Sequence, residues 1–500
     1  MATKPAGSQW LKEHYKLSGY SLTHSSYIGN NASIELTSKG NVVQVYGLKY
    51  APATDTPLSH LEFALKYDDL SLDFFRSVFE KLSAEEIGAF IQKSPAGKYV
   101  RKIGFLYEFL TGKTVALENA VPANYTDLLE KEKYVTGSVI KNAKWKINNN
   151  LLGDQRYSPI VRKTRVLATL LEMNVQEKIA QLKNTYPPDI FRRATNYLYN
   201  KETRSSYEIE KEKPSPGRME KFMNLLVKAG SEATEKILEK QRLVQLQNAI
   251  VDPRFAATGF RDFQNFVGES LPGYHELIHY VCPPPGMLLS LMDGLKETAT
   301  KTHGIYPGIR AALIAFGFVF IHPFEDGNGR LHRFLIHDML VHDGIVPQGL
   351  IIPVSARILN NIKDYDTILE KYSKPLMRRI QYDKRENGEI TITNPSEVEG
   401  YYRYPDLTEH CIYLIQTIHA TLDEDMPGEL LFLQRYDEAK REMQQVVDMP
   451  DNDINLMILF LHQNKGVFPK RRREQFAKLT DEEIQQMQQV FREVYELGNV

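Results

Sequence analysis

The sequence has few cysteines and lacks any long apolar run. Only Cys282 and Cys411 occur in 500 residues, which excludes a disulfide framework and a cysteine-based metal site. The apolar runs are far too short to span a bilayer, and the opening residues, MATKPAGSQW, lack the apolar region of a signal peptide. We therefore expect a cytoplasmic protein with no membrane partner.

The sequence also lacks an excess of charge of either sign. Lys and Arg number 62, Asp and Glu 63, and the net charge is −1. Broad nucleic-acid binding needs surplus cations that neutralise phosphates, so we expect no nucleic-acid partner. The short basic run at 470–473 is more typical of a solvated surface. Internal repeats and low-complexity tracts are missing too, and the length predicts about three domains.

Periodicity and turn residues divide the chain into four regions. Strand signals lie in residues 20–50, and helical spacing follows from about residue 72, with capping boxes beginning at Ser83 and Thr480. Polar stretches at 142–159 and 391–406 predict linkers. We expect a mainly α protein with a small α+β domain at 1–145, a helical segment at 160–250, a core at 251–385 and a helical domain at 400–500. The pattern gives no oligomeric state.

One hairpin is predicted just inside the core region. The segments DFQNFVGES and YHELIHYVC have extended character and flank Leu271-Pro272-Gly273. A run of three prolines, 283–285, ends the second strand. Helical spacing then returns and continues to a short polar stretch at residues 322–333.

That stretch, HPFEDGNGRLHR at residues 322–333, combines groups suited to phosphate chemistry. A Gly-Asn-Gly turn that opens a helix directs free backbone N–H groups and the helix dipole at one point, which favours an anion. Arg330 and Arg333 add two guanidinium groups. Asp326 would repel phosphate unless Mg²⁺ lies between them. His322 is the candidate general base.

A zinc site in the same region is not predicted. His332, His337 and His342 lie five residues apart, so on a helix they point from three different faces. They cannot meet at one ion, and a packed or hydrogen-bonded role suits His337 better.

With every fixed position matched, residues 322–333 resemble the motif of the Fic family, HPFx(D/E)GNGRxxR. The resemblance is strong over about 255–380 and extends to the hairpin upstream of the motif. It implies a helical Fic core with a β-hairpin flap. It also implies an enzyme, an adenylyltransferase that moves AMP from ATP to a Ser, Thr or Tyr hydroxyl of a target protein or of itself.

The resemblance also assigns roles within the motif. It implies that His322 deprotonates the acceptor hydroxyl, Asp326 holds Mg²⁺ and Phe324 anchors the loop. The nucleotide phosphates would contact the remaining motif residues: Gly327, Asn328, Gly329, Arg330 and Arg333. The related Doc-type kinases carry a lysine in place of the second glycine, so Gly329 favours nucleotidyl transfer over phosphoryl transfer.

In the family, the hairpin docks the target by strand addition, in which backbone hydrogen bonds hold a segment without reading its sequence. The residues implied for this flap are Phe263, Val267, Gly268, Tyr274, Leu277 and Tyr280. The alternative is an ordinary hairpin packed on the core.

Many family members also carry an inhibitory helix with the pattern (S/T)xxxE(G/N). Ser206 and Glu210 resemble it, within a predicted helix at about 190–213, and spacing of four puts both on one face. Lys211 departs from the pattern's Gly or Asn. The resemblance implies that Glu210 binds Arg333; the alternative is a surface helix whose Glu210 pairs with a nearby lysine.

Two classes of function stay open at this point. The chain is either the autoinhibited adenylyltransferase, or a scaffold protein whose Fic core is permanently inhibited. A narrower alternative is a Fic enzyme that uses another nucleotide or removes AMP.

Overall fold

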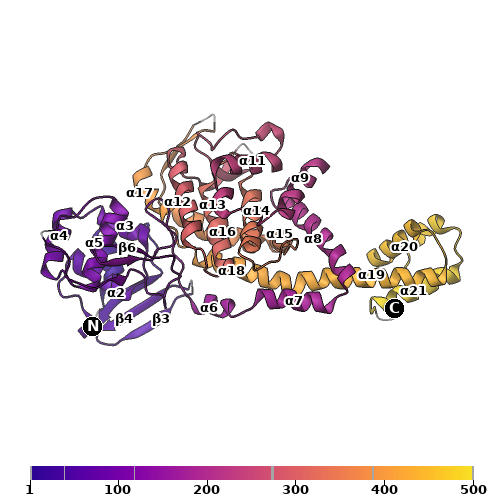
Figure 1. Ribbon diagram of the computed structural model, residues 1–500, viewed down its shortest axis with the longest axis horizontal. Helices are drawn as coiled ribbons and strands as arrows, with labels where there is room; N and C mark the ends of the chain where they lie inside the picture. The colour runs from indigo at the N-terminus through magenta and orange to yellow at the C-terminus, as the bar shows by residue number, and fades with distance from the viewer. Residues whose placement is uncertain (1–2, 39, 118, 272–274, 386–387, 498–500) are drawn as a thin grey trace.

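The structure, a computed structural model, describes residues 3–38, 40–117, 119–271, 275–385 and 388–497. The protein is mainly α. Figure 1 shows an N-terminal α+β domain beside a large helical body, and a smaller helical domain at the far end of the long helix α19 (Met426–Val446). No helix in these ranges combines the length and apolarity needed to cross a membrane.

Among the described residues, the N-terminal domain comprises five α-helices and two small sheets. The first sheet has strand order β1-β2-β4-β3, and β2 and β4 run parallel. The second has order β5-β7-β6. The elements are β1 (Lys4–Ala6), α1 (Gly7–His14), β2 (His24–Gly29), β3 (Ser33–Leu36), β4 (Val42–Gly47), α2 (Pro57–Tyr67), α3 (Leu72–Phe79), α4 (Ala84–Lys93), α5 (Lys98–Thr111), β5 (Thr126–Asp127), β6 (Ile140–Asn142) and β7 (Ile147–Asn149).

The linker expected at 142–159 is instead part of the folded core. Trp145 within it is fully buried, lies against Gly104 of α5 and donates its indole N–H to Glu108 at 2.8 Å. The asparagines are used as well, since Asn150 exchanges side-chain hydrogen bonds with the backbone of Leu129. The prediction was wrong because polar side chains here satisfy buried backbone groups instead of facing water.

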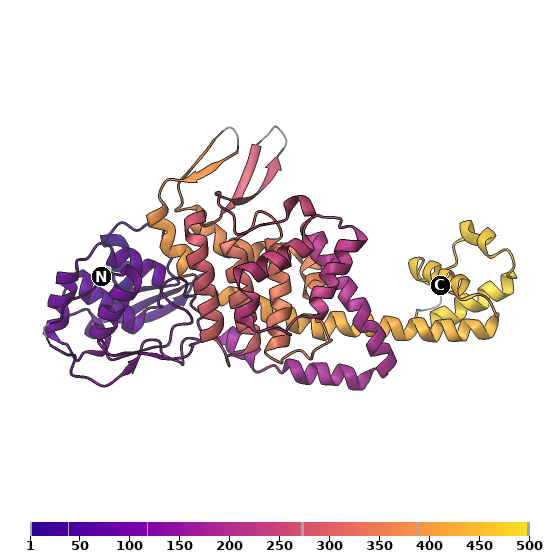
Figure 2. The ribbon, with the colours of Figure 1, turned by 45° about the horizontal axis from the view of Figure 1, so that its top comes forward.

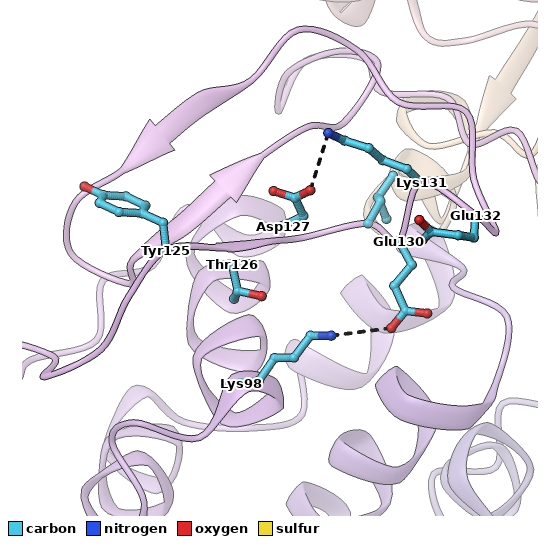
Figure 3. Close-up of a pocket in the computed structure, with 8 residues that line it drawn as sticks. Lys98, Tyr125, Thr126, Asp127, Glu130, Lys131 and Glu132 are labelled. Carbon is cyan, nitrogen blue, oxygen red and sulfur yellow. Dashed lines mark ion pairs between the residues drawn. The ribbon is translucent and has the colours of Figure 1, made fainter.

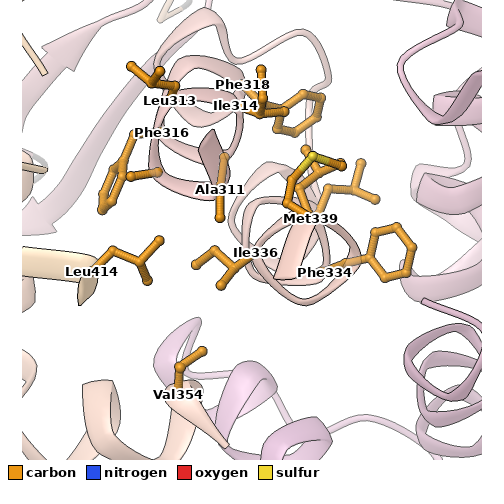
Figure 4. Packing of buried hydrophobic residues seen from close by; sticks show 14 of the residues in the cluster. Ala311, Leu313, Ile314, Phe316, Phe318, Phe334, Ile336, Met339, Val354 and Leu414 are labelled. Carbon is orange, nitrogen blue, oxygen red and sulfur yellow. The ribbon is translucent and has the colours of Figure 1, made fainter. Parts of the chain in front are cut away.

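The central body is built around the buried helix α13 (Pro307–Ile321), which packs against α14 (Asn328–His342). Figure 4 shows apolar side chains of both helices meeting those of α15 and α18. The other helices are α6 (Arg165–Leu171), α7 (Val175–Thr185), α8 (Pro188–Ile209), α9 (Pro216–Val227), α10 (Thr234–Ile237), α11 (Lys240–Ile250), α12 (Leu288–Lys301), α15 (Val354–Asn360), α16 (Ile362–Met377), α17 (Pro395–Arg403) and α18 (Thr408–Ala420).

One hydrophobic core joins the regions expected as separate at 160–250 and 251–385, and it extends to Leu430. The second expected linker, 391–406, is therefore wrong too. It forms α17, whose Tyr402 is buried and donates its hydroxyl to the carbonyl of Val281 at 2.9 Å. The C-terminal domain begins later than residue 400, with its own core between α19, α20 (Asp451–Gln463) and α21 (Asp481–Val494).

Predictions that depend on a few consecutive residues are confirmed by the structure. Both predicted capping boxes are confirmed, at Ser83 with Glu86 and at Thr480 with Glu483. The predicted hairpin is confirmed as β8 (Phe266–Leu271) and β9 (His275–Val281). A second hairpin, β10 (Tyr382–Lys384) and β11 (Ile390–Ile392), projects beside it in Figure 2. Lys384 and Glu276 link the two through an ion pair of 2.5 Å.

Candidate active site

The polar stretch 322–333 forms the connection between α13 and α14. His322 ends α13 in the left-handed conformation, with φ 53°, and Gly327 begins α14 with φ 90°. Phe324 between them is fully buried, with its ring against Phe260. The loop thus has one apolar anchor and two positive-φ corners, which bring the histidine to the N-terminus of α14.

The ring of His322 is held in one orientation. Its Nδ1 lies 3.0 Å from the carbonyl oxygen of Val319, which requires a proton on Nδ1 and leaves Nε2 as the acceptor. Burial lowers the pKa of His322 to about 4, an effect that the nearby Arg261 reinforces. The imidazole is therefore neutral at physiological pH, as a general base must be before the reaction.

Asn328 closes the loop from inside. Its amide accepts from the backbone N–H of Phe324 at 3.0 Å and donates to the carbonyl of the same residue at 2.9 Å. The side chain is buried and both of its polar ends are occupied. The structure thus places Asn328 as a brace of the loop, where the family resemblance implied a phosphate contact.

Arg261, which the sequence did not single out, joins this loop to the base of the hairpin. Its buried guanidinium donates to the carbonyls of His322 (2.8 Å), Phe263 (2.7 Å) and Pro283 (2.7 Å). Its backbone N–H donates to Pro323. The carbonyls of His322 and Pro283 belong to segments distant from Arg261 in sequence, so this side chain fixes motif and hairpin relative to each other.

Asp326 lies at the edge of the site, partly exposed. Its Oδ1 accepts from the N–H of Gly327 and from Arg330, both at 2.6 Å, and Oδ2 has no hydrogen bond within the described ranges. Those ranges also hold no cluster of three or more His, Cys, Asp or Glu that could bind an ion. A single carboxylate with a free oxygen fits Mg²⁺, which takes most of its ligands from phosphate and water.

Arg333 is fully buried and held by α8. It donates to the hydroxyl and the carbonyl of Ser206, both at 2.7 Å, and to Glu210 at 2.8 Å. The Glu210 carboxylate lies directly against Gly329, because a Cβ built there would meet Glu210 Oε1 at 2.0 Å. Glu210 thus covers the N-terminus of α14 as well as its second arginine.

Lys211 explains why the family pattern has Gly or Asn after the glutamate. It adopts φ 57°, which side chains other than Gly and Asn disfavour. Its N–H bonds the carbonyl of Glu208, and the N–H of Glu212 bonds that of Tyr207. This is the Schellman arrangement that ends a helix. Lys211 keeps the turn at a cost in strain.

The same turn brings a second acid to the site. Glu212 contacts Arg330, the first arginine of the motif, at 2.5 Å. Sequence reasoning missed this residue, because nothing in the pattern predicts on which side of the turn its carboxylate lies. Both motif arginines are therefore paired with acids of the segment that follows α8.

Helices α8 and α14 meet along a polar seam that continues away from the site. Glu202, buried one turn before Ser206, accepts from His337 at 2.7 Å and from the backbone N–H of Ser355 at 2.8 Å. His337 is thus hydrogen-bonded, as expected. The spacing of four on both helices pairs Glu202 with His337 and Ser206 with Arg333, so α8 is attached at successive turns.

The hairpin residues implied for target docking differ in exposure and in surroundings. Phe263, Val267 and Leu277 are exposed. Gly268 lies at a bulge, where a Cβ would meet the carbonyl oxygen of Leu277 at 2.6 Å. Tyr280 does not face a target: it is buried and its hydroxyl donates to the carbonyl of Phe320. Tyr274 lies outside the described residues.

Two surface pockets differ in their relation to this site. One, of about 380 Å³ in the N-terminal domain, is shown in Figure 3; four of its charged residues pair with each other, Lys131 with Asp127 and Lys98 with Glu130. The other, of about 390 Å³, adjoins the base of the hairpin and includes Phe260 and Arg261 in its wall. Only the second touches groups that position the motif.

Comparison with known proteins finds a family model that matches the region of this site. Residues 237–340 match the model of the Fic/DOC family, and they include all of 322–333. A Fic family protein from Desulfovibrio desulfuricans G20 is 16% identical, with a TM-score of 0.39 over 62% of this chain and 87% of that chain. A Fic domain containing signaling protein from Bacteroides thetaiotaomicron VPI-5482 is 18% identical, with a TM-score of 0.35 over 51% and 97%.

Proposed function

We propose that this chain, which carries a Fic/DOC domain at residues 237–340, is a protein adenylyltransferase whose activity is restrained by Glu210. The observation that supports it best is that the site already holds a carboxylate, that of Glu210, on one of its two motif arginines. A neutral His322 and an anion-binding helix end lie in one loop, and Glu210 lies on Arg333 where a phosphate would bind. The acceptor is a hydroxyl of a protein partner or of the chain itself.

In this reaction the oxygen of the acceptor hydroxyl bonds the α-phosphorus of ATP, and the bond from that phosphorus to the bridging oxygen breaks. Pyrophosphate leaves. Nε2 of His322 accepts the hydroxyl proton, because its Nδ1 is committed to Val319. The N-terminus of α14, Arg330 and Arg333 would bind and orient the phosphates and stabilise the charge of the leaving group.

Asp326 is the residue that would hold Mg²⁺, which when bound neutralises phosphate charge. Gly329 leaves room for a phosphate at the start of α14, because it has no Cβ. The Glu210 carboxylate now fills that space, and a phosphate could take it when Glu210 leaves. With Glu210 in place, a triphosphate loses both that space and a guanidinium. Inhibition on this account is competition between a carboxylate and a phosphate for Arg333.

The test is incubation with Mg²⁺ and ATP labelled on the α-phosphate. Glu210→Gly should raise incorporation into protein by at least about tenfold, within the range usual for coupled sites. Combination with His322→Ala should abolish it. Glu208→Gly is the matched control, because it removes an acid from the same end of α8. The partner of that acid is Arg204.

Other outcomes separate the alternatives. Label from the γ-phosphate instead of the α-phosphate would mean phosphoryl transfer. Transfer only from another nucleotide would change the donor. Release of AMP from a modified protein would mean the reverse chemistry. No transfer from any nucleotide, in a folded Glu210→Gly variant, would favour a scaffold protein.

A further inference from the structure

The carboxylate of Glu212 bridges two guanidinium groups. Its Oε2 lies 2.5 Å from Arg330 Nη1, and its Oε1 lies 2.5 Å from Nη1 of Arg218, the third residue of α9. Two arginines that hold one oxyanion between them have the arrangement in which proteins bind phosphate. Arg218 comes from outside the residues matched by the family model.

The two arginines are positioned by shared contacts independent of Glu212. Both guanidinium groups lie 5.3 Å from the ring of Tyr207 and both donate to the carbonyl of Ile250, Arg218 at 2.9 Å and Arg330 at 3.3 Å. Tyr207 is fixed in turn, since its hydroxyl donates to the same carbonyl. The pair of cations is therefore held by the fold, while the anion between them is supplied by a turn.

The arginines also retain unused donors. Nε of Arg218 and Nε of Arg330 are buried and have no acceptor in hydrogen-bonding geometry among the described residues. A carboxylate has two oxygens, whereas a phosphate group presents three or more and can reach additional donors. Glu212 therefore satisfies this pair of cations only in part.

The numbers of cations and acids at this site also favour an anionic ligand. Three guanidinium groups, those of Arg218, Arg330 and Arg333, are paired with three carboxylates, those of Asp326, Glu210 and Glu212. If the turn after α8 withdraws, two carboxylates leave together and three cations remain facing one acid. A polyphosphate bound with Mg²⁺ is still an anion and would restore the balance.

We propose that Arg218 and Arg330 form a subsite for the polyphosphate tail of the nucleotide, and that Glu212 occupies this subsite as a second displaceable carboxylate beside Glu210. The inference rests on the proposed function in taking a nucleoside triphosphate as the ligand. Arg218 is then a binding residue of the site that lies outside the motif. The Schellman turn is the device that carries both acids.

The experiment measures binding of ATP, ADP and AMP with Mg²⁺ by calorimetry, so that no transfer is required. Glu212→Gln keeps the shape and removes the charge. It should tighten ATP binding by about threefold to tenfold, and again when added to Glu210→Gly. Arg218→Ala in the Glu210→Gly variant should weaken ATP by about tenfold and leave AMP within about twofold, because AMP lacks the tail.

Arg204→Ala is the control, since that arginine is exposed on α8 and pairs only with Glu208 within the described residues. A melting curve for each variant shows that it is folded. If Arg218→Ala weakens ATP and AMP equally, or neither, Arg218 is a structural partner of Glu212 and the inference is overturned. If the Glu210→Gly variant binds no nucleotide, the proposed function itself fails, which is a separate result.

Discussion

His322 has a side chain but adopts the left-handed backbone conformation that glycine prefers, and it is half-buried. Such strain persists only where the surroundings impose it, and it recurs at functional sites. Here the surroundings are the end of α13, the buried Phe324 and the Arg261 guanidinium on the His322 carbonyl. Burial within this loop also lowers the pKa of His322.

The lowered pKa predicts the acid limb of the pH profile. A general base must be neutral, and burial lowers the pKa of His322 to about 4, so protonation removes activity only as the pH falls toward that value. For the Glu210→Gly variant at saturating ATP, the transfer rate should stay level down to about pH 5. An ordinary histidine would already lose half its activity near pH 6.5. ATP binding measured at each pH is the control, and a midpoint near 6.5 would contradict the prediction.

Lys211 gives a second prediction at this scale. Replacing it with glycine relieves left-handed strain and should stabilise the turn by about 1 kcal/mol. Hydrogen exchange of the backbone amides at positions 211 and 212 should then slow by roughly fivefold. ATP binding should weaken in step, because the turn carries both acids. The control is Lys213→Gly, where φ is not positive. Faster exchange or tighter ATP binding in Lys211→Gly would refute this account.

At the scale of elements, helix α8 contacts α14 through polar side chains at intervals of four residues, Glu202 with His337 and Ser206 with Arg333. The anchor at Glu202 and His337 is buried, whereas the end at Glu210 is 37% exposed. Burial of the acidic side chain therefore decreases along the seam from Glu202 to Glu210. This arrangement suits a helix whose last turn separates while its body stays packed.

The hairpin gives a prediction at the same scale. A side chain at Gly268 would meet the carbonyl of Leu277 at 2.6 Å, so Gly268→Val should force β8 and β9 apart. In the Glu210→Gly background, transfer to protein should fall by about tenfold or more if acceptors dock on the strand edge. ATP affinity should not change. Glu269→Val introduces the same side chain at the next, exposed position and is the control; equal transfer in both variants would argue against docking on the hairpin.

At the scale of the molecule, the two terminal domains are attached differently. The N-terminal domain is locked to the central body, with Arg379 stacked on Tyr20 at 3.7 Å and paired with the buried Asp73. Arg76 and Glu399 add a second link. The C-terminal domain has a separate core and follows the central body through α19 (Figure 1). Helix α19 pairs with α8 through Arg193–Asp437 and Lys201–Glu429, so the part of this domain farther from the site is the core around α20 and α21.

This difference predicts independent unfolding of the C-terminal domain. Met457→Ala removes a fully buried side chain from its core and should cost that domain about 2–5 kcal/mol. Hydrogen exchange should rise over 451–494 and over the C-terminal part of α19 that shares this core, with ATP affinity unchanged in the Glu210→Gly background. Leu456→Ala, at a 41% exposed neighbour, is the control. Exchange that also rises in α14 would show that the domains are coupled.

Much of what the sequence predicted concerned signals contained in a few consecutive residues. The capping boxes, the hairpin and the loop at 322–333 depend on side chains near their own backbone, so their form follows from local spacing. The linkers failed for the opposite reason. Polarity at 142–159 and 391–406 indicated exposure, but burial depends on which distant segments cover a stretch.

The sequence by itself determined the chemistry of the loop: its base, its acid, its glycine turn and its two arginines stand within twelve residues. Only the tertiary structure decided what those groups face. Glu212 and Arg330 are 118 residues apart along the chain, and Arg261 reaches His322 across 61. Such contacts depend on how helices pack, and a single sequence without its fold does not specify which of many acids and arginines meet.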